Sequence, residues 1–232
     1  MTTGEKFEKI ADIVYDKGKA DGDKALWDAI TGNNTRTNYI YGIYRWLGVE
    51  YLHPPYQIKV VGACDYMISF CDKLKKIEKE FFDLSGVTGV PIALFRNNAM
   101  LEEIEDCGLP TLGKHDANYL NCNALHTIEL IRSNVTTTYS NTFNNCHNLA
   151  NVKFEGEIGQ NISFQHSPLS KASITNIFEH LSTTTSGTTL TLKKTAVNAA
   201  FGIDVDDENT YPEGSEYYTL RHSRDNWSVG YA

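Results

Sequence analysis

The stretch that decides the fold is Phe143-Asn-Asn-Cys146-His-Asn-Leu149-Ala-Asn-Val152-Lys-Phe154, because its pattern occurs at three earlier places in the chain. An aromatic or aliphatic residue, a Cys or Asn, a Leu and a β-branched residue recur three positions apart in four consecutive units. The spacings between the unit leucines are 27, 24 and 24 residues, from Leu74 through Leu101 and Leu125 to Leu149. Self-similarity at such a period is typical of repeat proteins.

These units predict a solenoid in which each unit contributes a short strand around Leu-x-x-Ile/Val. A single unit cannot cover its own apolar side, so the units must stack and bury a ladder of Leu and Ile. We expect the Cys or Asn to point inward at a turn, where it packs or satisfies neighbouring backbone groups. Long amphipathic helices are disfavoured because the Asn residues between 141 and 151 are poor helix formers. The pattern also allows a single short helical turn before each strand.

The second unit and the loop that precedes it depart from the regular pattern. Asn98 stands where the other units have Cys, and the strand of that unit ends in Glu105-Asp106. The loop from Asp83 to Pro91 is enlarged. We therefore expect irregular curvature across the first two units.

The flanks of the array read differently. Residues 1–32 form a predicted amino-terminal helix with Phe7, Ile10 and Val14 on one stripe, serving as an anchor or for self-association. Residues 33–62 are a predicted cap, 63–160 the repeats and 161–232 a carboxyl-terminal α/β cap. Within that last region the pattern predicts a turn from Ser163, a helix from Ser173 to Leu181 and strands at 188–193 and 225–229.

Composition restricts the function classes. The chain has 232 residues, 41% of them hydrophobic, so it can bury a core. The 29 acidic residues exceed the 21 basic ones, giving a net charge of -8 with no basic block, which disfavours nucleic acid as a partner. We find no signal peptide and no apolar stretch long enough to span a membrane, so we expect synthesis in the cytoplasm and no membrane partner. The cysteines form no CxxC pair, so they read as reduced core residues.

The repeats resemble those of BspA-like leucine-rich repeat proteins. Residues 25–39 resemble a segment that precedes the repeats in proteins encoded by phages and prophages of Gram-positive gut bacteria. Segments 154–158, 162–171, 190–192 and 226–229 are similar to the closing segment of those proteins. The resemblance implies a short leucine-rich repeat array, an α/β solenoid, in a phage context near tail genes.

Candidate chemistry is sparse in the sequence. Cys146-His147 has the residue types of a nucleophile and its base, but Cys146 occupies the inward position of its repeat, which favours core packing. The acidic run Asp204–Asn209 lacks the Gly and distal Glu of an EF-hand, so a solvated loop is favoured over a Ca²⁺ site. We therefore predict no catalytic residue, no metal and no cofactor.

Partner binding is assigned to two groups of residues. The first is the amino-terminal stripe, and the second is an aromatic and basic cluster that contains residue types favoured at interface hot spots but also reads as a packed cap. The candidate partner-binding residues are Phe7, Ile10, Val14, Arg36, Tyr39, Arg45 and Trp46.

These features together predict a non-enzymatic phage protein, a tail-associated virion module that binds other virion proteins or a host-surface protein or glycan and that can form a homo-oligomer. The alternative is an intracellular phage protein whose acidic surface blocks a host defence or regulatory protein. A cell-wall hydrolase needs paired carboxylates in a cleft, and the sequence identifies no such pair.

Overall fold

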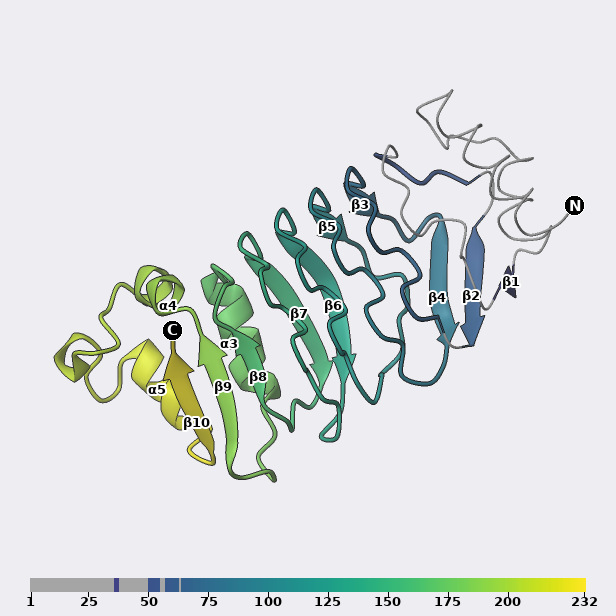
Figure 1. Ribbon diagram of the computed structural model, residues 1–232. Coiled ribbons are helices and arrows are strands. Elements are labelled where there is room, and N and C mark those ends of the chain that lie inside the picture. The colour runs from purple at the N-terminus through teal and green to yellow at the C-terminus, as the bar shows by residue number, and fades with distance from the viewer. Residues whose placement is uncertain (1–35, 38–49, 55–56, 63) are drawn as a thin grey trace, which may run out of the picture.

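The computed structural model describes residues 36–37, 50–54, 57–62 and 64–232, and this part of the chain winds into an elongated parallel β-solenoid (Figure 1). Successive coils stack along one axis, so that the first described strands and the carboxyl-terminal end lie at opposite ends of the described solenoid. The solenoid expected from the repeats is confirmed.

The repeat strands form one parallel sheet in the order β3 (Lys76–Ile77), β5 (Glu103–Ile104), β6 (Thr127–Ser133) and β7 (Asn151–Gly156). The β-branched residue of each unit pairs with that of the next, so that Ile77, Ile104, Ile128 and Val152 share one register row. Register is fixed because a slip of one residue would turn this buried row toward solvent.

The interior consists of ladders of like residues. Each of the four unit leucines is 0% exposed, as the stacking argument predicts. In a second ladder, the rings of Phe95, Tyr119, Phe143 and Phe164 stack in succession with centroid separations of 5.9, 5.6 and 4.5 Å. Offset stacking of aromatic rings adds to the energy of their burial. The core is therefore one continuous column.

The aromatic side of each coil is a turn that requires two residues with positive φ. The first such position is held by Tyr66, Ala93, Ala117 and Asn141, and the second by Phe70, Asn97, Asn121 and Asn145. Asn tolerates this left-handed conformation better than most residues, which explains its concentration in the repeats. The Asn121 amide donates to the Asn97 side chain at 2.6 Å, and Asn145 donates to Asn121 at 2.7 Å, so these side chains also link the coils.

The Cys or Asn of the last three repeats satisfies backbone groups of the preceding coil. Asn98 Nδ2 donates to the Ile68 carbonyl at 2.7 Å, and its Oδ1 accepts from the Cys71 amide at 2.8 Å. In the next two coils the Cys122 and Cys146 thiols donate to backbone carbonyls at 3.0 and 3.1 Å. The role expected for this position is therefore confirmed.

A second parallel sheet lies in line with the stack at the first described coils, in the order β1 (Arg36–Thr37), β2 (Ile58–Gly62) and β4 (Phe82–Val87). Strand β4 occupies the start of the segment that the sequence indicated as an enlarged loop from Asp83 to Pro91. Phe82, Leu84 and Val87 are buried on it. The spacing from Leu84 to Val87 is one residue longer than strict alternation allows, and the pairing of β4 with β2 is irregular at this point. This shift in alternation hid the strand.

Helix α3 (Lys171–His180) closes the edge of the repeat sheet. Ser170 caps it, and the helix lies against β7. Ser173 Oγ accepts from the Val152 amide at 2.9 Å, and Asn176 Oδ1 accepts from the Phe154 amide at 2.7 Å. Side chains of a helix thus replace the next strand as partners of the β7 edge, which would otherwise be open to aggregation.

The carboxyl-terminal region forms a third parallel sheet, in the order β10 (Trp227–Tyr231), β9 (Thr188–Leu192) and β8 (Ile162–Phe164). Around it lie α4 (Lys194–Phe201), the short helix η2 (Glu208–Thr210) and α5 (Glu216–His222). The helix expected at 173–181 and the strands expected at 188–193 and 225–229 are present with bounds shifted by one or two residues. The expected turn from Ser163 begins inside a strand, β8.

Candidate binding surface

Charged residues of the solenoid gather on the strand face, where they pair between coils. Arg132 contacts both Asp106 carboxylate oxygens at 2.8 Å, and Lys76 contacts Glu105 at 2.6 Å. The hydrogen bonds from Arg132 lower the pKa of Asp106 below its usual value. Because these charges neutralise each other across the stack, they serve the solenoid itself more than a ligand.

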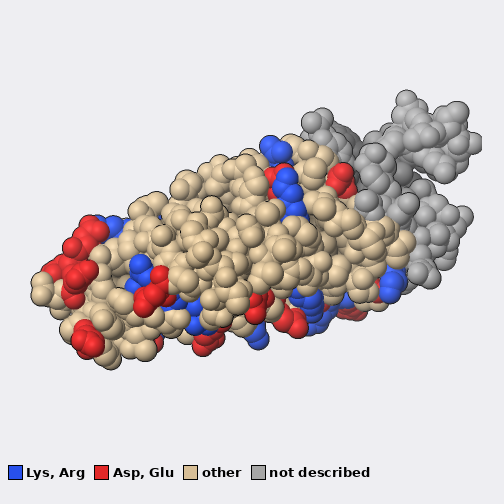
Figure 2. Space-filling view, turned by 90° about the horizontal axis from the view of Figure 1, so that it is seen from below, with Lys and Arg blue, Asp and Glu red and all other residues tan. Residues whose placement is uncertain are grey.

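The turns that follow the strands carry almost no charge. The runs 84–95, 107–113, 133–152, 158–170 and 180–192 contain no Asp, Glu, Lys or Arg. Strands β2, β4, β6 and β7 all point toward these turns, which face the viewer in Figure 2. That view is uncharged over most of its middle, with charged side chains at its margins and at the carboxyl-terminal tip. We call the turns at 88–92, 109–113, 134–138 and 158–161 the uncharged face.

The uncharged face is held rigid by contacts between successive turns. Thr137 Oγ1 donates to the Leu112 carbonyl at 2.8 Å, and Gln160 Nε2 donates to the Val135 carbonyl at 3.1 Å. A Cβ at Gly159 would lie 2.3 Å from the Val135 carbonyl oxygen, so only Gly permits this approach. A surface whose shape is already fixed loses little conformational entropy on binding.

Small polar and apolar side chains project from this face. Thr88, Thr111 and Thr136 are exposed, and Val90 is 48% exposed. Such a surface offers hydroxyl groups and apolar contacts without the desolvation cost of charges. It fits a partner surface that is itself neutral.

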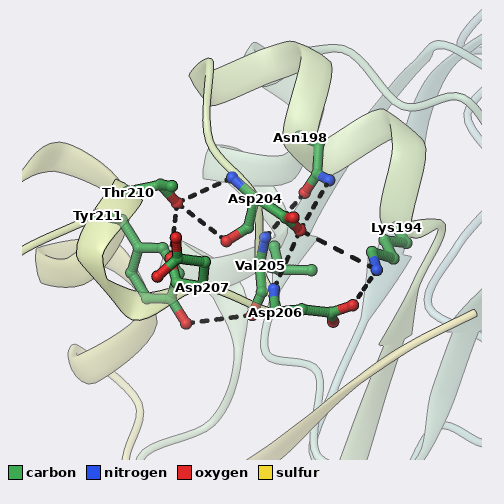
Figure 3. A network of polar contacts seen from close by, with 8 residues as sticks. All are labelled: Lys194, Asn198, Asp204, Val205, Asp206, Asp207, Thr210 and Tyr211. Atoms are coloured by element: carbon green, nitrogen blue, oxygen red, sulfur yellow. Dashed lines mark hydrogen bonds and ion pairs between the residues drawn. The ribbon is translucent and has the colours of Figure 1, made fainter.

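The acidic run at 204–209 forms a loop that is bonded to Lys194 and Asn198 of α4 (Figure 3). Lys194 Nζ contacts the Asp206 carboxylate and lies 4.0 Å from Asp204 Oδ1. Asp204 also accepts from the Asp206 amide at 3.2 Å, and Asp207 accepts from the Asn209 amide at 3.0 Å. These carboxylates accept from Lys194 and from backbone amides, and the Asp204 and Asp206 side chains are also exposed to solvent. No group of three or more His, Cys, Asp or Glu side chains suited to a metal ion occurs among the described residues.

The thiols and the buried histidine lie in the core. All five cysteines are buried, and burial raises the pKa of Cys64, Cys107 and Cys122 to about 12. The Cys146 thiol donates a hydrogen bond to the Tyr119 carbonyl in the core, whereas the His147 side chain is exposed. Cys146 and His147 are therefore not arranged as a nucleophile and its base. Burial lowers the pKa of His115 to about 4, which keeps its ring neutral.

Hollows are also formed by described residues. One, of about 390 Å³, lies between β6, β7 and the first turn of α3 and includes Ile128, Val152 and Ala172 in its lining. Another, of about 430 Å³, lies at the carboxyl-terminal tip between η2, α5 and β10. Both volumes fall in the range of small-molecule sites.

Most of the partner-binding residues predicted from the sequence lie outside the described residues. These are Phe7, Ile10, Val14, Tyr39, Arg45 and Trp46, while Arg36 lies in β1, where its backbone pairs with Lys59. The sequence reasoning missed the uncharged face. The signal that could have found it is the absence of charge in stretches that recur with the repeat period.

No family model matches the chain, and neither a curated protein nor a solved structure was found to be similar to it. Among the described residues, no helix combines the length and apolarity that crossing a membrane requires.

Proposed function

We propose that the chain is a non-enzymatic, BspA-like leucine-rich repeat protein of a phage or prophage that uses the uncharged face to bind a host-surface protein or glycan from the virion tail. The observation that carries this proposal is a rigid row of stacked turns in which uncharged side chains alone project over several coils. Solenoids of this kind present extended surfaces to partners. In this view the carboxyl-terminal α/β segment serves as the cap of the array.

The chemistry of the core supports a binding role. The thiols are protonated and committed to packing, and the acidic loop is engaged by Lys194. In this proposal, binding depends on the shape of the uncharged face and on the side chains exposed there.

The test compares binding of the purified chain to intact Gram-positive gut bacteria with that of two double variants. Thr111→Arg with Thr136→Arg places charges on exposed positions of the uncharged face. The matched control, Ala99→Arg with Asn123→Arg, places the same charges in exposed turns at the opposite end of the strands. We expect the first variant to lose binding about tenfold or more, because a charge that is desolvated without a partner is costly, and the control to bind as the original chain does.

Mass spectrometry of purified particles tests the virion assignment separately. Stoichiometric presence of the chain supports the tail. Its absence from particles, together with capture of one host cytoplasmic protein, would replace the proposal with the intracellular inhibitor. Equal cell binding by the two double variants would remove the uncharged face from the mechanism.

A further inference from the structure

The hollow at the carboxyl-terminal tip has walls that other contacts hold in place. Buried Tyr217 hydrogen-bonds through its hydroxyl to that of Tyr231, which ties α5 to β10. Tyr211 donates to the Val205 carbonyl at 3.3 Å, and its ring meets that of Tyr217 edge-on at 5.3 Å. The segments after η2, on α5 and on β10 are thereby fixed around one space of about 430 Å³.

The lining of this hollow combines aromatic rings with charges of both signs. Tyr211, Tyr218 and Tyr231 contribute rings, and Arg221, Glu208 and Glu213 contribute charged groups. The side chains of these three charged residues make no hydrogen bond or ion pair within the part of the chain that the structure describes. Arg221 differs in this respect from Arg132 and Lys194, which are paired.

The position of Arg221 near the end of α5 favours the helix electrostatically, but it leaves the donors of the guanidinium free. Tyr218 stacks on His222 with ring centroids 4.0 Å apart, which orders one wall beside this cation. The hollow therefore offers free donors, free acceptors and ordered rings together.

This combination selects a class of ligand. Sugar hydroxyl groups both donate and accept, so they match a site that has an unpaired guanidinium and two unpaired carboxylates. The apolar C–H face of a sugar ring suits a tyrosine ring, which is apolar with one polar end. A phosphate or other strong anion would meet two carboxylates for one arginine, and a purely apolar ligand would leave all three charges desolvated.

We propose that the hollow between η2, α5 and β10 is a binding site for a neutral saccharide, with Arg221, Glu208 and Glu213 bonding its hydroxyls and Tyr218 contacting its ring. The site shares no residue with the uncharged face, so it stands independently of the function proposed above.

The test screens the full chain against an array of immobilised mono- to tetrasaccharides of glucose, galactose, rhamnose and N-acetylhexosamines, with sulfated and uronic sugars included. Affinities for the soluble forms of the best binders are then measured by titration for the original chain, Arg221→Gln and Lys153→Gln. Lys153 is the matched control, an exposed cation on β7 without an ion pair among the described residues.

We expect a neutral sugar to bind, Arg221→Gln to weaken it about tenfold or more, and Lys153→Gln to leave the affinity unchanged, because a bond from a charged donor is lost only in the first variant. Tyr218→Ala, checked for folding by circular dichroism, should weaken the same sugar. The proposal is overturned if no sugar binds the original chain at millimolar concentration, if Arg221→Gln binds equally well, or if sulfated and uronic sugars bind more tightly than neutral ones.

Discussion

Asn98 is a single side chain that satisfies two buried backbone groups, the Ile68 carbonyl and the Cys71 amide. Asn98→Ala leaves both without a partner, so we expect the free energy of unfolding in urea to fall by about 2–5 kcal/mol. Asn98→Cys should lose less, because a thiol can still donate to the carbonyl, as it does in the next coil. Exposed Asn123→Ala is the control and should change little. Equal stability of Asn98→Ala and Asn123→Ala would contradict the assignment.

The buried thiols give the protein a predictable response to alkali. In the unfolded chain a thiol titrates near its ordinary pKa of 9, whereas Cys64, Cys107 and Cys122 in the folded chain hold their protons up to about pH 12. Below pH 9 the thiols are protonated in both the folded and the unfolded chain, so their full contribution to the free energy of unfolding is present. As pH rises from 9 toward 12 the unfolded state loses protons first, so the free energy of unfolding falls over this window.

Thiol reactivity checks the same feature. At pH 8 we expect Ellman's reagent to label none of the five cysteines within minutes in the native protein and all of them in urea. Rapid labelling of the native chain would show that a cysteine is accessible, contrary to its burial. A triple Cys64→Ala, Cys107→Ala, Cys122→Ala variant should show a weaker dependence of stability on pH above 9.

At the scale of the element, α3 ends the repeat sheet through Ser173 and Asn176. Asn176→Ala should release the Phe154 amide and Ser173→Ala the Val152 amide, so we expect hydrogen exchange to accelerate at these positions of β7. Each change should cost about 1–3 kcal/mol, the penalty of an unsatisfied buried group. Thr175→Ala on the same helix is the control, since no hydrogen bond of its side chain occurs in the described part of the chain. Unchanged exchange at Phe154 in Asn176→Ala would refute the role of this helix.

The elements differ in how far their sequence predicts them. Strands β3, β5, β6 and β7 follow from the Leu-x-x-Ile/Val pattern, because the same row must be buried in every coil. Strand β4 could not be predicted in this way, because its buried residues Leu84 and Val87 are three positions apart and break the two-residue alternation of a strand. The edge role of α3 also escaped prediction. Ser173 and Asn176 lie three residues apart on one face of a helix, but only the position of β7 shows what they bond.

At the scale of the whole molecule, the uncharged face predicts how binding depends on salt. If this face makes the contact, binding to cells should be nearly constant between about 0.05 and 0.5 M NaCl, because ions screen only charged groups. A steep loss of affinity over this range would favour the acidic surface of the alternative hypothesis. The double variant Thr111→Arg, Thr136→Arg should acquire salt dependence in whatever binding it retains.

The surfaces of the molecule were harder to predict than its core. The ladder residues are dictated by burial, so Leu149 and Cys146 could be placed from spacing alone. The uncharged face depends on how turns from separate coils align, and the hollow near Arg221 depends on the packing of η2, α5 and β10. The uncharged face and the hollow both depend on contacts between segments far apart in the sequence, and the residue pattern within one coil does not predict such contacts.

The closure of the β7 edge by α3 restricts where the array can grow over evolutionary time. Duplication of one 24-residue period such as 127–150 would insert a coil whose register rows already match on both sides. Each such event would lengthen the rod by one strand spacing, about 4.8 Å, and extend the uncharged face by one turn. A coil added after β7 would instead have to displace Ser173 and Asn176 from their amides. Variation in length among descendants of this gene should therefore fall before Asn151, with the carboxyl-terminal tip kept at constant size.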